Sequence, residues 1–186
     1  QQADPMLAPS VLGARLAAEL REYAGLLGSL FTPALTRQSP FLPDELTGIQ
    51  QVKGRIAQLH DLLHVRMSLG EHSPGVLQAH ARMDQDYFGQ AGALLREVLD
   101  AGHSHGLYPV DAGQFAARYV PPMDAIVALR DVQLTEADAR SAAAQAQSLR
   151  TMVMVGAMTA VGLVLLVVGA PWVAQRVWAI PNVPRN

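Results

Sequence analysis

Six histidines are the residues of this sequence best suited to chemistry near neutral pH. His60 and His64 are four residues apart, a spacing that places both on one helix face, where imidazoles could bind zinc or copper. In antiparallel helices, His60 and His80 would lie near one end. His103 and His105 would lie near the other end, so the five are not expected to converge. The sequence therefore favours histidines that titrate near neutrality, and it predicts no metal site.

The stretch GHSHG at 102–106 matches the G-x-S-x-G pattern of hydrolase nucleophiles. Such a nucleophile needs a strand that feeds a sharp turn into a helix, whereas the surrounding residues predict a helix that runs into a loop. Ser104 and its neighbouring glycines are therefore interpreted as a helix stop and a loop. No acid–base pair, phosphate-binding loop or cofactor motif stands out elsewhere, so the sequence predicts no enzyme and no cofactor.

Arginine and tyrosine side chains beside the apolar stripes suggest a third kind of site, a pocket for a small ligand. The arginine guanidinium offers a planar pair of donors to a carboxylate or another oxyanion, so a small anion is the expected ligand. The predicted lining residues are Arg21, Tyr23, Arg55, Arg118, Tyr119 and Arg130. The alternative is that these arginines are surface charges whose stems lie over the bundle.

The composition of the chain limits its partners. A net charge of −2 with 16% charged residues gives no bulk attraction to nucleic acid, so no nucleic-acid partner is predicted. The absence of cysteine excludes disulfides and thiolate metal sites. The chain begins Gln-Gln-Ala-Asp-Pro, and we expect an upstream signal peptide or first membrane span to have been removed.

Proline and glycine divide the first part of the chain into helical lengths, and no strand pattern appears. The first helix runs from about Pro9 into the thirties, where Pro33 bends or ends it. The second opens at Pro43 and closes at Gly70. The third opens with Ser73 as its N-cap.

A loop at 101–109 separates the third helix from a fourth. This last helix begins near Asp111, is interrupted by Pro121 and Pro122, and restarts at Met123. No helix breaker follows before the apolar stretch near the end of the chain.

Each helix carries apolar residues at spacings of three and four, which is typical of a core-facing stripe. The predicted stripes are Leu12, Leu16, Leu20, Tyr23, Leu27 and Leu30; Ile49, Val52, Ile56, Leu59, Leu63 and Met67; Leu77, Ala81, Phe88, Leu95 and Leu99; and Met123, Ile126, Val127 and Leu134. The sequence therefore predicts an all-α fold, with residues 1–150 as an up-down-up-down four-helix bundle.

Residues 151–175 contain no charged side chain between Arg150 and Arg176. A helix of 25 residues is roughly 37 Å long, which exceeds the ~30 Å hydrocarbon core of a bilayer. Trp172 and Trp178 lie where an interfacial aromatic belt is expected. The sequence therefore predicts a transmembrane helix that continues the fourth helix of the bundle.

Arginines flank this span equally, so the orientation rests on the tail at 176–186, which contains two arginines and no acid. We expect this short juxtamembrane tail in the cytoplasm and residues 1–150 in the periplasm or outside the cell. The predicted location is the inner, cytoplasmic membrane, crossed once or twice, so the lipid bilayer is a predicted partner.

Residues 135–150 contain six alanines and few large apolar side chains, so they cannot bury much area within one bundle. A thin alanine seam between two copies of the fourth helix would suit them, which predicts a homodimer. The alternative is an exposed connector of high helix propensity.

The stretches LREYAGLLGSLFTPAL, GIQQVKGRIAQLHDLL and YVPPMDAIVALRDVQL resemble in layout the nitrate- and nitrite-sensing type of helical input domain. More broadly, residues 15–150 are similar to the extracytoplasmic sensor domains of bacterial chemoreceptors, sensor histidine kinases and diguanylate cyclases. Arg176 and Pro181 have the spacing that opens many HAMP linkers, but NVPRN departs from the continuation. This resemblance carries no ligand residue onto the chain.

The resemblance implies a ligand-sensing input module that transmits a helix shift across the membrane to an output domain. The main alternative is a membrane-anchored helical scaffold or adaptor that binds another protein and no small ligand. A metal-bound adaptor is a third.

Overall fold

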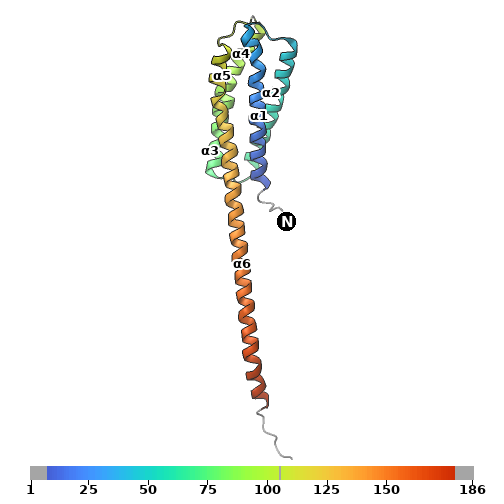
Figure 1. Cartoon of the computed structure of the whole chain (residues 1–186), viewed down its shortest axis with the longest axis vertical. Helices are drawn as coiled ribbons and strands as arrows, with labels where there is room; N and C mark the ends of the chain where they lie inside the picture. The colour runs from blue at the N-terminus through green and yellow to red at the C-terminus, as the bar shows by residue number, and fades with distance from the viewer. Residues whose placement is uncertain (1–7, 105, 179–186) are drawn as a thin grey trace, which may run out of the picture. The chain divides into compact units, whose positions relative to one another are not determined.

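The computed structural model describes residues 8–104 and 106–178, and it describes side chains at 11–104, 106–143, 146, 150 and 152–160. Helices are the only regular elements in these ranges (Figure 1). Contacts divide the chain into two units, Gln1–Ala139 and Arg140–Asn186. The predicted all-α class is confirmed for the described part of the chain.

The helices include one π-helical segment and one 3₁₀ turn. In chain order they are α1 (Ala8–Arg37), α2 (Pro43–Leu69), α3 (Pro74–Met83), the π-helix η1 (Asp84–Ala91), α4 (Gly92–Ser104), α5 (Ala112–Tyr119), the 3₁₀ turn η2 (Pro121–Met123) and α6 (Asp124–Trp178). α3, η1 and α4 follow one another directly, and only Val120 separates α5 from η2.

The helix starts agree with the predicted ones. α2 begins at Pro43. At the start of α3, the Ser73 hydroxyl accepts a hydrogen bond from the backbone N–H of Val76 at 3.3 Å. At the start of α5, the Asp111 carboxylate accepts from the backbone N–H of Gln114 at 2.7 Å. These caps satisfy N–H groups that have no partner inside the helix.

Pro33 was expected to bend or end the first helix, and it does not end it. α1 continues to Arg37, and Gln38 beyond it has a φ of 48°, in the left-handed region where helices commonly stop. Proline removes one backbone hydrogen bond. Ala34 and Leu35 directly after it are almost fully buried, and their packing offsets that loss.

α1 and α2 lie side by side and run antiparallel (Figure 1). Arg37 near the end of α1 pairs with Glu45 near the start of α2 at 2.8 Å. Further along, Arg55 of α2 pairs with Glu19 of α1. Because the later residue of α2 meets the earlier residue of α1, the two helices have opposite directions.

The predicted stripes of α1 and α2 face a common core. All but the last member of the α2 stripe are buried, and Met67 packs against the core in a partly buried position. On α1, Leu20 and Leu27 are buried as predicted, whereas Leu12 is 49% exposed. The spacing of large aliphatic residues was therefore a sound guide along these two helices.

The stripe predicted for the third helix is wrong in its first half. Leu77 is 51% exposed and Ala81 is exposed, while Met83, Tyr87 and Ala91 are buried. A π-helix has more residues per turn than an α-helix, so residues four apart stay on one face through η1. The α-helical period used for the prediction does not allow for this change.

The first part of α6 packs into the core through Ile126, as predicted, and Leu129 is buried beside it. Leu134, which was expected to face the core, is 41% exposed, and the buried residue next to it is Gln133.

Residues 151–175 are helical as part of α6. Within the part of the chain that the structure describes, none of the helices has both the length and the apolar character that a membrane span requires. The structure does not describe the side chains at 161–175, which make up most of the predicted span and include Trp172. The side chain of Trp178 also lies outside the described residues.

Candidate functional site

Two of the predicted pocket residues, Arg21 and Tyr119, line one pocket of about 320 Å³ between α1 and the α5–η2 segment. We call it the tyrosine pocket; its wall also includes Gly28, Phe115 and Met123. Its volume is near the lower limit for small-ligand sites. Arg21 supplies a cationic group at this pocket, as an anion site requires.

The hydroxyl of Tyr119 is already engaged inside the protein. It donates to the backbone oxygen of Ala24 at 2.8 Å, and the hydroxyl of Tyr87 lies 3.0 Å from it. Burial raises the pKa of Tyr119 well above its ordinary value and that of Tyr87 to about 12, while the charge of Arg21 opposes both shifts. Tyr119 therefore presents its ring, rather than a free hydroxyl, to the pocket.

Tyr23 and Arg55 contact each other at a different place. The guanidinium carbon of Arg55 lies 5.7 Å from the centre of the Tyr23 ring, and Arg55 pairs with Glu19. Tyr23 and Glu19, together with Arg15 and Glu22, line an open depression of about 500 Å³ along α1. The carboxylates there oppose an anion, and Glu19 partly neutralises Arg55.

The two remaining predicted residues, Arg118 and Arg130, line neither of these pockets. Arg118 is exposed on α5, and Arg130 on α6 is bound to the neighbouring carboxylate of Asp131 at 2.7 Å. The structure thus brings Arg21 to Tyr119 and Tyr23 to Arg55. It does not gather the six predicted residues around one pocket.

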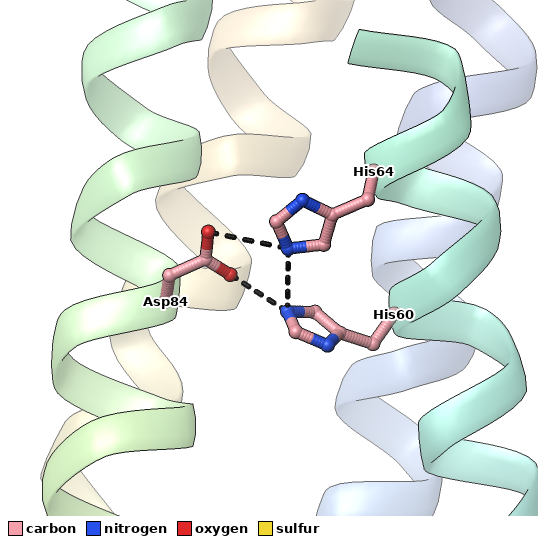
Figure 2. Close-up of side chains that lie close together, drawn as sticks. All are labelled: His60, His64 and Asp84. Carbon is pink, nitrogen blue, oxygen red and sulfur yellow. Dashed lines mark hydrogen bonds and ion pairs between the residues drawn. The ribbon is translucent and has the colours of Figure 1, made fainter. Parts of the chain in front are cut away.

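His60, His64 and Asp84 form a second site, which we call the histidine–aspartate cluster. Figure 2 shows the two imidazoles from α2 pointing toward the carboxylate of Asp84, the first residue of η1. His60 Nε2 lies 2.7 Å from Asp84 Oδ1 and 2.9 Å from His64 Nε2. His64 Nε2 lies 3.4 Å from Asp84 Oδ2. Each residue offers one potential metal-ligand atom, and these three atoms lie within 4.8 Å of one another.

Two further rings surround this cluster. His80 Nδ1 lies 3.3 Å from Asp84 Oδ2, and the Phe88 ring stacks on His60 with centroids 3.6 Å apart. His80 is buried, and burial lowers the pKa of His80, while the charge of Asp84 acts in the opposite direction and the neighbouring His64 adds to the lowering. The cluster therefore has an apolar and aromatic wall on the side of the core.

The helix geometry explains how the cluster forms. His60 and His64 are one turn apart on α2, and His80 and Asp84 are one turn apart on the antiparallel α3–η1 segment. The expectation that His60 and His80 lie near the same end is confirmed, since the rings of His64 and His80 are 4.7 Å apart. Sequence reasoning missed Asp84, although its spacing of four from His80 was a readable signal.

Of the other histidines, the two that the structure describes, His72 and His103, make their contacts elsewhere. His103 at the end of α4 is bound to its own helix through Leu99 O at 2.8 Å. His72 contacts the backbone oxygen of Arg66 at 3.1 Å. His105 lies outside the described residues.

A pocket of about 300 Å³ adjoins the cluster because His60 belongs to both. Its polar wall includes Lys53 of α2 and Arg96 of α4, and its apolar wall includes Tyr87 and Phe88 of η1. The two cations make this pocket a second place suited to an anion.

No protein-family model, curated protein or solved structure matches this chain. The comparisons therefore lend no activity, ligand or partner to it. The function has to be argued from the residues and the sites described above.

Proposed function

We propose that this chain is the ligand-sensing input module of a bacterial membrane signal-transduction receptor. In this proposal its helices form an up-down-up-down four-helix bundle that lies outside the inner membrane, and the last helix continues into a single transmembrane helix. The observation that carries the proposal is the continuity of α6, which is one helix from Asp124 to Trp178. The same element contributes Ile126 to the core and includes the predicted span.

The tyrosine pocket connects the proposed ligand to the last helix. Arg21 would bind the anion on α1. On the opposite wall, Tyr119 ends α5 and Met123 ends η2, directly before α6. A ligand that favours one packing of α5 and η2 against α1 would bias the position of α6. Shifts on the order of 1–2 Å are sufficient for switching, provided that the transmitting helix is stiff.

A chimaeric receptor tests this proposal. Residues 1–186 would replace the input part of a sensor histidine kinase that drives a reporter gene. Cells would be screened with small anions, amino acids and divalent metals. We expect at least one compound to change the output several-fold, and Arg21→Gln to abolish the response to an anion. A membrane-inserted chimaera that responds to nothing would contradict the sensing role.

The stiffness of α6 can be tested in the same chimaera. Ala143 is exposed and lies in the alanine-rich part of α6. Ala143→Pro removes a helical hydrogen bond and should uncouple the output while ligand binding persists. Ala143→Ser is the matched control, because it preserves the helix and keeps a small side chain at the proposed seam. Normal signalling by the proline variant would exclude transmission through a continuous α6.

The rival function, a membrane-anchored scaffold, is supported by a different surface. Leu62, Val65 and Leu69 recur at spacings of three and four on α2 and are exposed, Leu69 by 80%. An apolar row of this kind is typical of a helix that contacts another protein. If the chimaera is silent and Val65→Glu abolishes recovery of a bound protein from the native cell, the scaffold is the better account.

The proposal includes a homodimer along residues 135–150. Ala142, Ala143 and Ala146 are exposed in the single chain, where a second copy of the helix could approach closely. Single cysteines introduced at these positions should cross-link between copies in the membrane. Cysteines at Arg118, on α5, are the control and should not.

A further inference from the structure

We propose that His60, His64 and Asp84 bind a divalent transition-metal ion of the zinc type, which links α2 to the α3–η1 segment. The three side chains come from two antiparallel elements and point toward one another (Figure 2). The proposal revises the prediction from sequence that the chain has no metal site.

The distances in the histidine–aspartate cluster fit a small tetrahedral ion. Zn²⁺ binds imidazole nitrogen and carboxylate oxygen at about 2.0–2.2 Å, which places neighbouring ligand atoms about 3.3 Å apart. His60 Nε2 lies 2.7 Å from Asp84 Oδ1, His64 Nε2 lies 3.4 Å from Asp84 Oδ2, and the two Nε2 atoms are 2.9 Å apart. Separations that differ by a few tenths of an ångström can be adjusted by small rotations of the side chains.

Hydrogen bonding alone does not satisfy the cluster. Each Nε2 carries either one hydrogen or one lone pair. If both carry hydrogen, both can donate to the ionised Asp84, but then two N–H groups face each other across 2.9 Å. If either nitrogen carries a lone pair, that lone pair faces the carboxylate. A divalent cation accepts lone pairs from all three side chains at once and removes this conflict.

The surroundings hold the ligands in place. His80 Nδ1 lies 3.3 Å from Asp84 Oδ2, the oxygen that His64 also faces, so an N–H there would orient this ligand. Phe88 stacks on His60 and restricts the rotation of its ring. We assign His80 as a positioning residue and His60, His64 and Asp84 as the ligands.

The site is accessible and leaves room for an exchangeable ligand. The side chain of His64 is 49% exposed, so an ion can enter from solvent. Three protein ligands leave the fourth tetrahedral position for water or another small molecule, the pattern of zinc sites that are not purely structural. His60 and His64 come from α2, whereas Asp84 and its positioning residue His80 come from the α3–η1 segment. Metal occupancy therefore stabilises the contact between α2 and this segment.

This inference stands apart from the signalling role. If the chain binds zinc but the chimaera gives no output, the metal site is supported and the sensing role is contradicted. If the chimaera responds to an anion but the chain binds no zinc, the sensing role is supported and the metal site is contradicted.

Calorimetric titration of the untagged, chelator-treated 186-residue chain with Zn²⁺ in detergent tests the site. We expect one ion per chain. His64→Ala and Asp84→Asn should each weaken binding at least about 100-fold, because loss of a supporting residue alone costs about 10–100-fold. His80→Ala should weaken it about 10-fold. His103→Ala is the matched control and should bind as the unaltered chain does.

Co²⁺ provides a readout that reports the ligand geometry directly. The Co²⁺-loaded chain should show the intense visible absorption of tetrahedral coordination, and His64→Ala should lose it while keeping its circular dichroism. His64 is well exposed, so this variant should fold normally. Unchanged affinity in both His64→Ala and Asp84→Asn, or no binding of Zn²⁺ by the unaltered chain, would overturn the proposal.

Discussion

The tyrosine pocket and the histidine–aspartate cluster lie on the same helical unit, but their polar atoms are satisfied in different ways. In the pocket, the Tyr119 hydroxyl donates to a backbone oxygen of α1, so the polar group fixes helix packing. In the cluster, His60, His64 and Asp84 contact mainly one another, and with Asp84 ionised no placement of the imidazole hydrogens makes all three contacts hydrogen bonds. The first arrangement stabilises the fold by itself, whereas the second is completed by a ligand.

The largest expected effect comes from removing the ring at the tyrosine pocket. Tyr119→Ala deletes one of the largest fully buried side chains and should lower the free energy of unfolding by about 3–5 kcal/mol. His64→Ala, in the presence of a chelator, should change it by less than about 0.5 kcal/mol, because the side chain is exposed. Chemical unfolding followed by circular dichroism measures both. Similar losses in the two variants would remove the contrast between the regions.

Zinc should stabilise only through the cluster. At a free concentration about 100 times the Kd, an ion that binds the folded chain alone raises the free energy of unfolding by about 2.7 kcal/mol. We expect this gain in the unaltered chain and in Tyr119→Phe, and its loss in His64→Ala. The same unfolding measurement with and without Zn²⁺ checks it, and a gain that survives His64→Ala would place the ion elsewhere.

Alkaline pH should weaken the tyrosine region. Burial raises the pKa of Tyr87 from 10.0 to about 12, so the unfolded chain releases a proton that the folded chain retains. The stability due to this difference is present below about pH 10 and is lost as the pH rises toward 12, by about 3 kcal/mol in all. The raised pKa of Tyr119 acts in the same direction.

Unfolding midpoints measured across this pH range test the effect. Tyr87→Phe should show a smaller decrease than the unaltered chain, because it has one buried hydroxyl fewer to ionise. An equal decrease in both would assign the alkaline sensitivity to other groups.

The two regions also differ in how far the sequence predicts them. The α2 stripe, the cap at Ser73 and the helix start near Asp111 follow from local rules, and the structure has them as predicted. The core face of α3 could not be predicted, because η1 changes the helical period and turns Leu77 outward. Asp84 joins the histidines only through this segment, so the cluster depends on a contact between helices that no single stretch of sequence encodes.

The predicted ligand residues show the same limit. Arginine and tyrosine were reasonable residue types for an anion pocket, and Arg21 and Tyr119 do share one. Their spacing along the chain does not reveal that Arg55 is paired with Glu19 on another helix. Contacts across helices, rather than residue types, decide which charges remain available to a ligand.

The smallest expected effects come from two helical glycines and test how tightly the tyrosine pocket is packed. A Cβ atom at Gly28 would lie 2.7 Å from the Tyr119 ring, whereas a Cβ atom at Gly54 of α2 would have no neighbour within 4 Å. Gly28→Ala should therefore destabilise the chain by about 1–3 kcal/mol, because the buried ring cannot move away without strain. Gly54→Ala should stabilise it by about 0.5–1 kcal/mol, since alanine is the better helix former. Chemical unfolding of the full chain measures both changes in the free energy of unfolding. Stabilisation by both substitutions would mean that the Tyr119 ring moves freely, and the pocket would then be no more rigid than the cluster.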